Sequence, residues 1–311
     1  MPEIQLADLC FATRLRRWLA LCGLLLVAAT WRLWTPQVVF PQIPFLAVLR
    51  TVPGWIDWIA LTGVVAGLVG LLLTPGERGA SALRALSNRA ASWFACLFVA
   101  SLTLLILLDQ HRFQPWAYQF AIVAIALAFV PAQRALSLLR LLRLLTIGIY
   151  FWSAVSKLDY TFLHGLGPEL LRGTLTAFGL EPRWMRSDVA TALALAFPLD
   201  ELAVAALLAF RRTRKYGLIL AIAMHVLLLA TLGPLGLNHS WGVLLWNVYF
   251  IGQDVLLFAP LASGGRQPSE SADRSAAAAT PVSLSLGRGA GGEGMPCRVI
   301  CSFGQLINRR G

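Results

Sequence analysis

Long apolar runs separated by short polar segments form the dominant pattern along this chain. A helix that crosses a membrane needs about 20 mostly apolar residues. About eight windows approach that length, near residues 17–34, 55–74, 92–108, 117–132, 138–156, 188–210, 216–234 and 240–260, the fourth being short. The pattern predicts an all-α fold, a polytopic transmembrane helix bundle of about eight spans.

The pattern changes near residue 261, where Ser, Ala, Gly, Pro and Arg replace the apolar runs. Segments of this composition bury too little apolar surface to fold by themselves. We therefore expect two parts, a transmembrane domain over residues 10–260 and a low-complexity, disordered tail over residues 261–311.

Basic residues lie in clusters before the first window and after the second, fourth and sixth. The clusters are Arg14, Arg16 and Arg17; Arg78, Arg84 and Arg89; Arg134, Arg140 and Arg143; and Arg211, Arg212, Arg214 and Lys215. Because Lys and Arg favour the cytoplasmic side of a membrane, we predict that both termini are cytoplasmic. The remaining loops, including the long one after Lys157, are then exoplasmic.

Composition supports the membrane class and excludes others. Of the 311 residues, 58% are hydrophobic and 13% charged, and the net charge is +11. The basic residues follow the membrane pattern, so we expect the lipid bilayer, and no nucleic acid, as the partner. Five cysteines show no spacing with histidine that is typical of zinc, so neither a metal nor disulfides are predicted. The first apolar run has no small-residue cleavage site and reads as a retained signal-anchor of a bacterial inner-membrane protein.

Polar residues inside the apolar windows are the first candidates for a site, because polar groups at membrane depth usually face the bundle interior or water. They are Asp200, Glu201, His225, Asn247 and Asp254. Glu201 follows Pro198 by three residues, and functional and structural roles are equally open for it. Asn247 also fits a helix-to-helix hydrogen bond, and His225 a satisfied buried histidine.

The fifth window ends in Tyr150-Phe-Trp-Ser-Ala-Val-Ser-Lys-Leu-Asp159. On a helix, Tyr150, Ser153 and Lys157 share one face. Lys157 is a candidate site residue, with a snorkelling lysine paired with Asp159 or with headgroups as the alternative.

Two loops add further candidates. The turn from Asp109 to Tyr118 contains an acid, His111 and aromatic residues, although a surface ion pair of Asp109 with Arg112 and an interfacial aromatic belt would also explain them. His239 lies in a loop, where it could also simply be solvated.

Three stretches together resemble one known family. They are Leu108-Asp109 with the turn to Tyr118; Tyr150 to Asp159 with its Lys157-Leu-Asp ending; and Met224-His225, Gly233-Pro234, Asn238-His239-Ser240 and Trp246-Asn247. The pattern resembles the membrane domain of vitamin K-dependent gamma-carboxylase, whose bacterial relatives are horizontally transferred transmembrane domain proteins. The resemblance implies a multi-span bundle in which Lys157 is the base that deprotonates a quinol.

The chain departs from that family in its polar turn. Gln114-Pro115-Trp116 stands where the carboxylases have an asparagine pair and a histidine, and we expect no counterpart of their large lumenal domain. Peptide carboxylation is therefore not expected.

Two functions remain in view. The first is chemistry on a quinol, vitamin K-like, or on another lipid-soluble substrate in an exoplasmic cavity. There Lys157 would be the catalytic base, and the cavity or binding candidates are Asp109, His111, Tyr118, Tyr150, Asp159, Glu201, His225, His239 and Asn247. The second is a non-enzymatic membrane scaffold or small-solute carrier, in which Glu201 and Asp254 serve packing or ion coupling.

Overall fold

Helices make up all the regular structure in the described part of the chain. The computed structural model describes residues 2–36, 41–76, 81–130, 134–180 and 187–259, and these ranges contain no strand. The predicted all-α class is therefore confirmed. The predicted tail, residues 261–311, lies outside the described residues.

Each of the predicted windows coincides with helix. The elements are α1 (Pro2–Ala29), α2 (Trp31–Trp34), η1 (Ala47–Thr51), α3 (Trp55–Leu73), α4 (Ser81–Leu108), η2 (Gln110–Arg112), α5 (Pro115–Phe129), α6 (Ala135–Ser156), η4 (Phe162–Leu166), α7 (Gly167–Ala177), α8 (Ser187–Ala194), α9 (Ala196–Ala209), α10 (Arg214–Leu232) and α11 (Trp241–Phe258). Among the described residues, 6 helices are long and apolar enough to cross a membrane. The chain is an integral membrane protein, which agrees with the predicted inner-membrane localisation.

The two remaining windows are filled by α1 and by the shorter apolar helix α5, which has 15 residues. The sixth window is divided into α8 and α9 at Leu195. Pro198 lies three residues further on and has no N–H with which to bond the carbonyl of Ala194, so an interruption at this position is expected.

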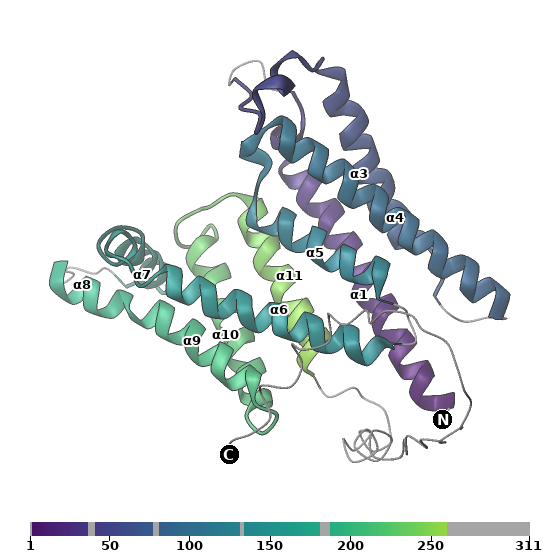
Figure 1. Cartoon of the computed structure of the whole chain (residues 1–311). Coiled ribbons are helices and arrows are strands. Elements are labelled where there is room, and N and C mark those ends of the chain that lie inside the picture. Colours follow the sequence, from purple (N-terminus) through teal and green to yellow (C-terminus); the bar gives the residue numbers. More distant parts are fainter. Residues whose placement is uncertain (1, 37–40, 77–80, 131–133, 181–186, 260–311) are drawn as a thin grey trace, which may run out of the picture. The chain divides into compact units, whose positions relative to one another are not determined.

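The helices α3 and α4 lie side by side (Figure 1) because a glycine lets their backbones approach. A Cβ atom added at Gly67 would lie only 2.7 Å from the backbone nitrogen of Phe98 and 2.9 Å from the carbonyl oxygen of Phe94. No larger residue fits there without separating the two helices.

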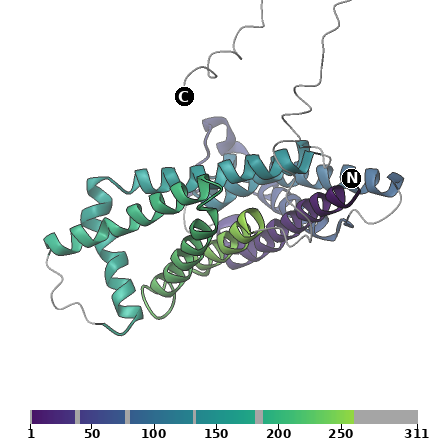
Figure 2. The ribbon, with the colours of Figure 1, turned by 90° about the horizontal axis from the view of Figure 1, so that it is seen from below.

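The second packed group consists of α6, α9, α10 and α11. In Figure 1 and Figure 2, α9 runs beside α6, and α10 runs beside α11. α1 connects the two groups, since it packs against α3 on one side and α11 on the other. Large apolar side chains such as Trp93, Phe129, Leu144 and Ile219 are exposed, as expected for faces that contact lipid.

Candidate functional site

A row of polar side chains runs along one face of α6. Arg143, Thr146, Tyr150, Ser153 and Lys157 are spaced by three and four residues in turn, which keeps them on one side of the helix. Fourteen residues of α-helix span about 21 Å, most of the roughly 30 Å hydrocarbon core. The predicted shared face of Tyr150, Ser153 and Lys157 is thus part of a longer row.

Lys157, the C-cap residue of α6, forms an ion pair with Glu201 of α9. Its Nζ atom lies 2.8 Å from both carboxylate oxygens and also donates to Ser153 Oγ at 2.5 Å. Ser153 Oγ in turn donates to Glu201 Oε1 at 3.2 Å. The Lys157 side chain keeps 25% of its surface exposed and Glu201 only 12%, so this pair lies at the edge of the bundle interior. The alternative partner Asp159 is not used by Lys157.

Two turns before Lys157, Tyr150 belongs to a buried chain of hydrogen bonds that joins α6, α10 and α11. Its hydroxyl oxygen lies 2.8 Å from His225 Nε2 and also bonds Asp254 Oδ2. His225 Nδ1 lies 2.9 Å from Asn247 Oδ1, and Asn247 Nδ2 donates to the Val243 carbonyl at 2.9 Å. All four side chains are buried, with Asp254 at 0% exposure. The cluster places the sequence candidates Tyr150, His225 and Asn247 together.

The hydrogen bonds among Tyr150, His225, Asn247 and Asp254 restrict which of these side chains can carry a proton. Because the Asn247 amide nitrogen faces a carbonyl, its oxygen faces His225, and His225 Nδ1 must donate. Tyr150 has a single hydroxyl proton for two neighbours. If it donates to Asp254, then His225 Nε2 must carry a proton; if it donates to His225, then Asp254 Oδ2 must carry one.

The two arrangements have the same net charge and differ by the position of one proton. Going from the second to the first, the Asp254 O–H bond breaks as Tyr150 receives that proton, and the original Tyr150 proton moves to His225 Nε2. Asp254 Oδ1 is buried without a hydrogen-bond partner in the described residues. An ionised carboxylate with an unpaired oxygen is costly in the interior, which favours the arrangement with neutral Asp254 and His225.

A second series of hydrogen bonds runs through the buried side-chain amides of Gln119 and Gln253, and we call it the amide chain. The Trp246 indole donates to Gln119 Oε1 at 3.2 Å, Gln119 Nε2 to Gln253 Oε1 at 3.3 Å, and Gln253 Nε2 to Thr146 Oγ1 at 2.9 Å. Thr146 then donates to the Leu142 carbonyl. Every bond in this chain has one possible direction, and none of its groups titrates, so it joins α5, α6 and α11 without moving a proton.

Along α6, charged groups lie on both sides of the buried hydrogen bonds of Tyr150. Lys157 and its partner Glu201 of α9 lie on one side, at the C-terminal end of α6. Arg143 lies two turns before Tyr150, where its Nε donates to the Leu257 carbonyl at 2.7 Å. Between Arg143 and Tyr150 only a narrow void remains, lined mainly by leucines together with Val123, Thr146 and Gln253. The Tyr150 chain is thus nearer to polar surroundings on the Lys157 side.

Asp109 and His111 form a separate group. Asp109 accepts from the backbone N–H of His111 and lies 2.8 Å from its Nδ1. The expected ion pair of Asp109 with Arg112 is wrong. Arg112 is fully buried, pairs with Asp57 of α3, and donates its Nε to the Leu33 carbonyl at 3.0 Å. Arg112 can lie inside the bundle because the Asp57 carboxylate and the Leu33 carbonyl replace water around its guanidinium group.

The remaining sequence candidates lie apart from the Lys157–Glu201 pair and from the hydrogen-bonded cluster around Tyr150. Tyr118 is 41% exposed, with its ring 5.3 Å from that of Phe113. Asp159 accepts from the backbone N–H of Phe162 at 2.7 Å and so caps the turn that follows α6. His239 is exposed. None of the candidates lines the cavity of about 360 Å³ that the structure contains between α1, α3, α4, α5 and α6.

Several polar residues of the interior were missed from the sequence, namely Asp57, Gln119, Thr146 and Gln253. Gln253 precedes Asp254 on α11 and Thr146 lies one turn before Tyr150 on α6, whereas Asp57 and Gln119 lie near the starts of α3 and α5. Asp254, by contrast, was recognisable because it repeats Asn247 at seven-residue spacing on α11. Among the described residues, no group of His, Cys, Asp and Glu could hold a metal ion.

One family model matches the part of the sequence that contains several of these residues. The model described as Methylamine utilisation protein MauE matches residues 122–242, which is less than half of the chain. The match covers α6, α9 and α10, and so includes Tyr150, Lys157, Glu201 and His225. No curated protein and no solved structure gives a significant match to the chain.

The resemblance to gamma-carboxylase and to horizontally transferred transmembrane domain proteins is therefore wrong, since the family that matches is a different one. The three stretches that suggested it are short, and polar and aromatic residues at the ends of apolar helices recur in unrelated membrane proteins. The role of Lys157 as the base of a quinol reaction was implied by that resemblance and loses this support. In this structure the Lys157 Nζ atom contacts both carboxylate oxygens of Glu201.

Proposed function

We propose that this chain is a proton-coupled carrier of a small solute, with Tyr150, His225 and Asp254 as the place where a proton is held inside the membrane. The observation that carries the proposal is that the hydrogen bonds of Tyr150, His225, Asp254 and Asn247 allow two proton arrangements of the same net charge. Ionisable residues at membrane depth are costly, and in membrane proteins they commonly serve proton or ion pathways.

The Lys157–Glu201 pair supplies the approach to this site. It is part-exposed, and Ser153, which bonds both members, lies one turn from Tyr150 on the same face of α6. On the opposite side, Leu142, Leu145 and Leu257 leave only a narrow void. This conformation therefore favours exchange from the Lys157 side, and a carrier would need a second conformation that opens the other side.

The solute is proposed by class. The matched family is described by methylamine utilisation, and methylamine is a small cation whose passage could be exchanged for a proton. It is therefore the first solute to test, together with ammonium and larger amines.

The test uses the full chain in liposomes that contain a pH-sensitive dye. An imposed solute gradient should move protons through the wild-type protein, and Tyr150→Phe should reduce this flux at least tenfold, because no hydroxyl then joins His225 and Asp254. Tyr118→Phe is the matched control, since that tyrosine is exposed and outside the chain, and it should leave the flux unchanged.

A second measurement separates proton handling from packing. The infrared band of a protonated carboxyl group should be present in the wild type and absent in Asp254→Asn. Absence of the band in the wild type, or full flux in a folded Tyr150→Phe protein, would contradict the proposal.

A non-enzymatic scaffold is the second candidate. It is favoured by the amide chain from Trp246 to Thr146, which is fully bonded and can only hold helices together. Under this alternative, Tyr150→Phe lowers stability and no solute-dependent flux exists in the wild type.

A further inference from the structure

The cavity between α1, α3, α4, α5 and α6 is separate from the hydrogen bonds of Tyr150, His225 and Asp254, and different residues line it. Its volume is about 360 Å³, within the range of roughly 300–1,000 Å³ that is typical of small-molecule sites. It opens among residues of the predicted cytoplasmic end, where Arg16 and Arg89 both line it. None of its lining residues is acidic.

One of the two arginines is held in place by the fold. Arg16 is 6% exposed and donates its Nη2 to the Thr74 carbonyl at 2.7 Å and to the Pro75 carbonyl at 3.3 Å. Arg89, by contrast, is exposed on α4 and can turn toward a ligand. Two cations at one cavity repel each other, so an anion between them would be stabilised by both.

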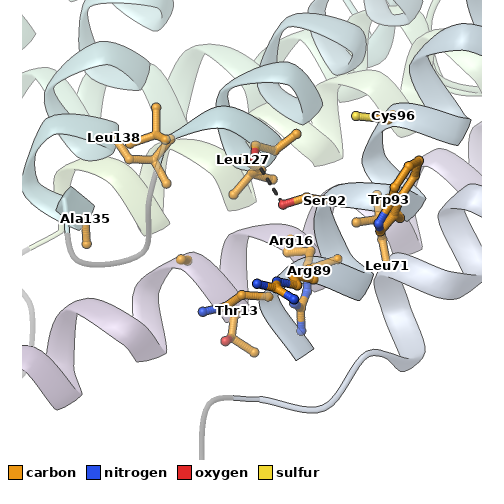
Figure 3. Close-up of a pocket in the computed structure, with 15 residues that line it drawn as sticks. Thr13, Arg16, Leu71, Arg89, Ser92, Trp93, Cys96, Leu127, Ala135 and Leu138 are labelled. Carbon is orange, nitrogen blue, oxygen red and sulfur yellow. Dashed lines mark hydrogen bonds between the residues drawn. The ribbon is translucent and has the colours of Figure 1, made fainter. Parts of the chain in front are cut away.

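The lining changes in character across the cavity. Figure 3 shows Arg16 and Arg89 toward the Thr13 end, with Cys96, Leu127 and Leu138 drawn toward the other end. A ligand that fills it must therefore have an anionic end and an apolar end. Asn88 and Ser92 also line the cavity, and Ser92 Oγ donates to the Ala128 carbonyl at 3.0 Å.

We infer that this cavity binds a phosphate-bearing lipid of the inner leaflet, with its phosphate between Arg16 and Arg89 and the start of an acyl chain along Leu127 and Leu138. Arginine suits this role because its planar guanidinium offers paired N–H donors to phosphate oxygens. Basic pockets between helices on the cytoplasmic side of membrane proteins bind anionic headgroups for the same reason. The inference does not depend on the proposed transport activity.

The test measures lipid binding to the full, detergent-solubilised chain by native mass spectrometry, with phosphatidylglycerol and phosphatidylcholine as probes. Arg89→Gln should weaken phosphatidylglycerol binding roughly fivefold, the effect of one basic residue at an anionic membrane surface. Arg212→Gln is the matched control. It is exposed in the loop between α9 and α10, on the same predicted side but away from the cavity, and it should leave the affinity unchanged.

A second measurement locates the lipid without altering a charge. In a protein whose other cysteines are replaced by serine, bound phosphatidylglycerol should slow the alkylation of Cys96 severalfold. Equal losses for Arg89→Gln and Arg212→Gln would overturn the inference, because the whole basic surface would then be responsible. Equal binding of both lipids, unchanged Cys96 alkylation, or displacement by millimolar inorganic phosphate alone would overturn it as well.

Discussion

The buried pair of Asp57 and Arg112 gives the sharpest prediction for stability. Arg112 is 0% exposed and Asp57 is 2% exposed, and together they join α3 to the turn after α4. Replacing Asp57 by alanine leaves a guanidinium ion in the interior without a counter-ion. Removal of one partner from a buried pair costs about 3–5 kcal/mol, so Asp57→Ala should lower the free energy of unfolding by that amount.

The double substitution Asp57→Leu with Arg112→Met should cost less than the single one. It removes both charges and loses the hydrogen bonds that Arg112 donates to the Leu33 and Leu105 carbonyls. Two such bonds contribute about 1–3 kcal/mol together, since each is typically worth about 0.5–1.5 kcal/mol. The double variant should therefore be more stable than Asp57→Ala.

The assay is unfolding in mixed detergent micelles with increasing dodecyl sulfate, followed by circular dichroism. Arg50→Met is the control, because Arg50 is exposed in η1 and its loss should change stability by less than about 0.5 kcal/mol. A cost below about 1 kcal/mol for Asp57→Ala, or a double variant as unstable as the sum of its two single variants, would refute the reasoning.

Two further predictions concern packing and the amide chain. Gly67→Ala should lower stability by about 1–3 kcal/mol, because its Cβ would meet the backbone of Phe98, whereas Gly148→Ala, with open space around it, should be neutral or stabilising by up to about 1 kcal/mol. Equal thermal midpoints for these two alanine variants would contradict the close packing of α3 on α4. Gln253→Leu should cost about 1–3 kcal/mol, because the buried Gln119 Nε2 donor and the Thr146 Oγ1 acceptor each lose the hydrogen bond to Gln253, and an unchanged thermal midpoint would show that the amide chain does not hold the helices together.

The class of fold could be predicted from the sequence because it depends on a property of single segments. A run of about 20 apolar residues is stable in a bilayer as a helix whatever its neighbours are, since its backbone bonds are satisfied within the run. The division at Leu195 follows from Pro198 in the same local way.

The groups of polar residues could be predicted only in part. The face shared by Tyr150, Ser153 and Lys157 follows from helical spacing, and this geometry is present in α6. Which residues meet them does not follow, because Glu201 lies 44 positions from Lys157 in the chain and Asp254 lies 104 from Tyr150. Arg112 shows the same limit, since its sequence neighbour Asp109 was the expected partner, yet it pairs with Asp57.

The sequence by itself thus determined that this is a polytopic helical membrane protein. It also indicated which polar residues are candidates for a site, among them Tyr150, Lys157, Glu201, His225 and Asn247. Only the tertiary structure decided that Lys157 is neutralised by Glu201 and that Tyr150 stands between His225 and Asp254. The physical reason is that hydrophobic length acts within one helix, whereas the position of a proton depends on the donors and acceptors that packing brings together from several helices.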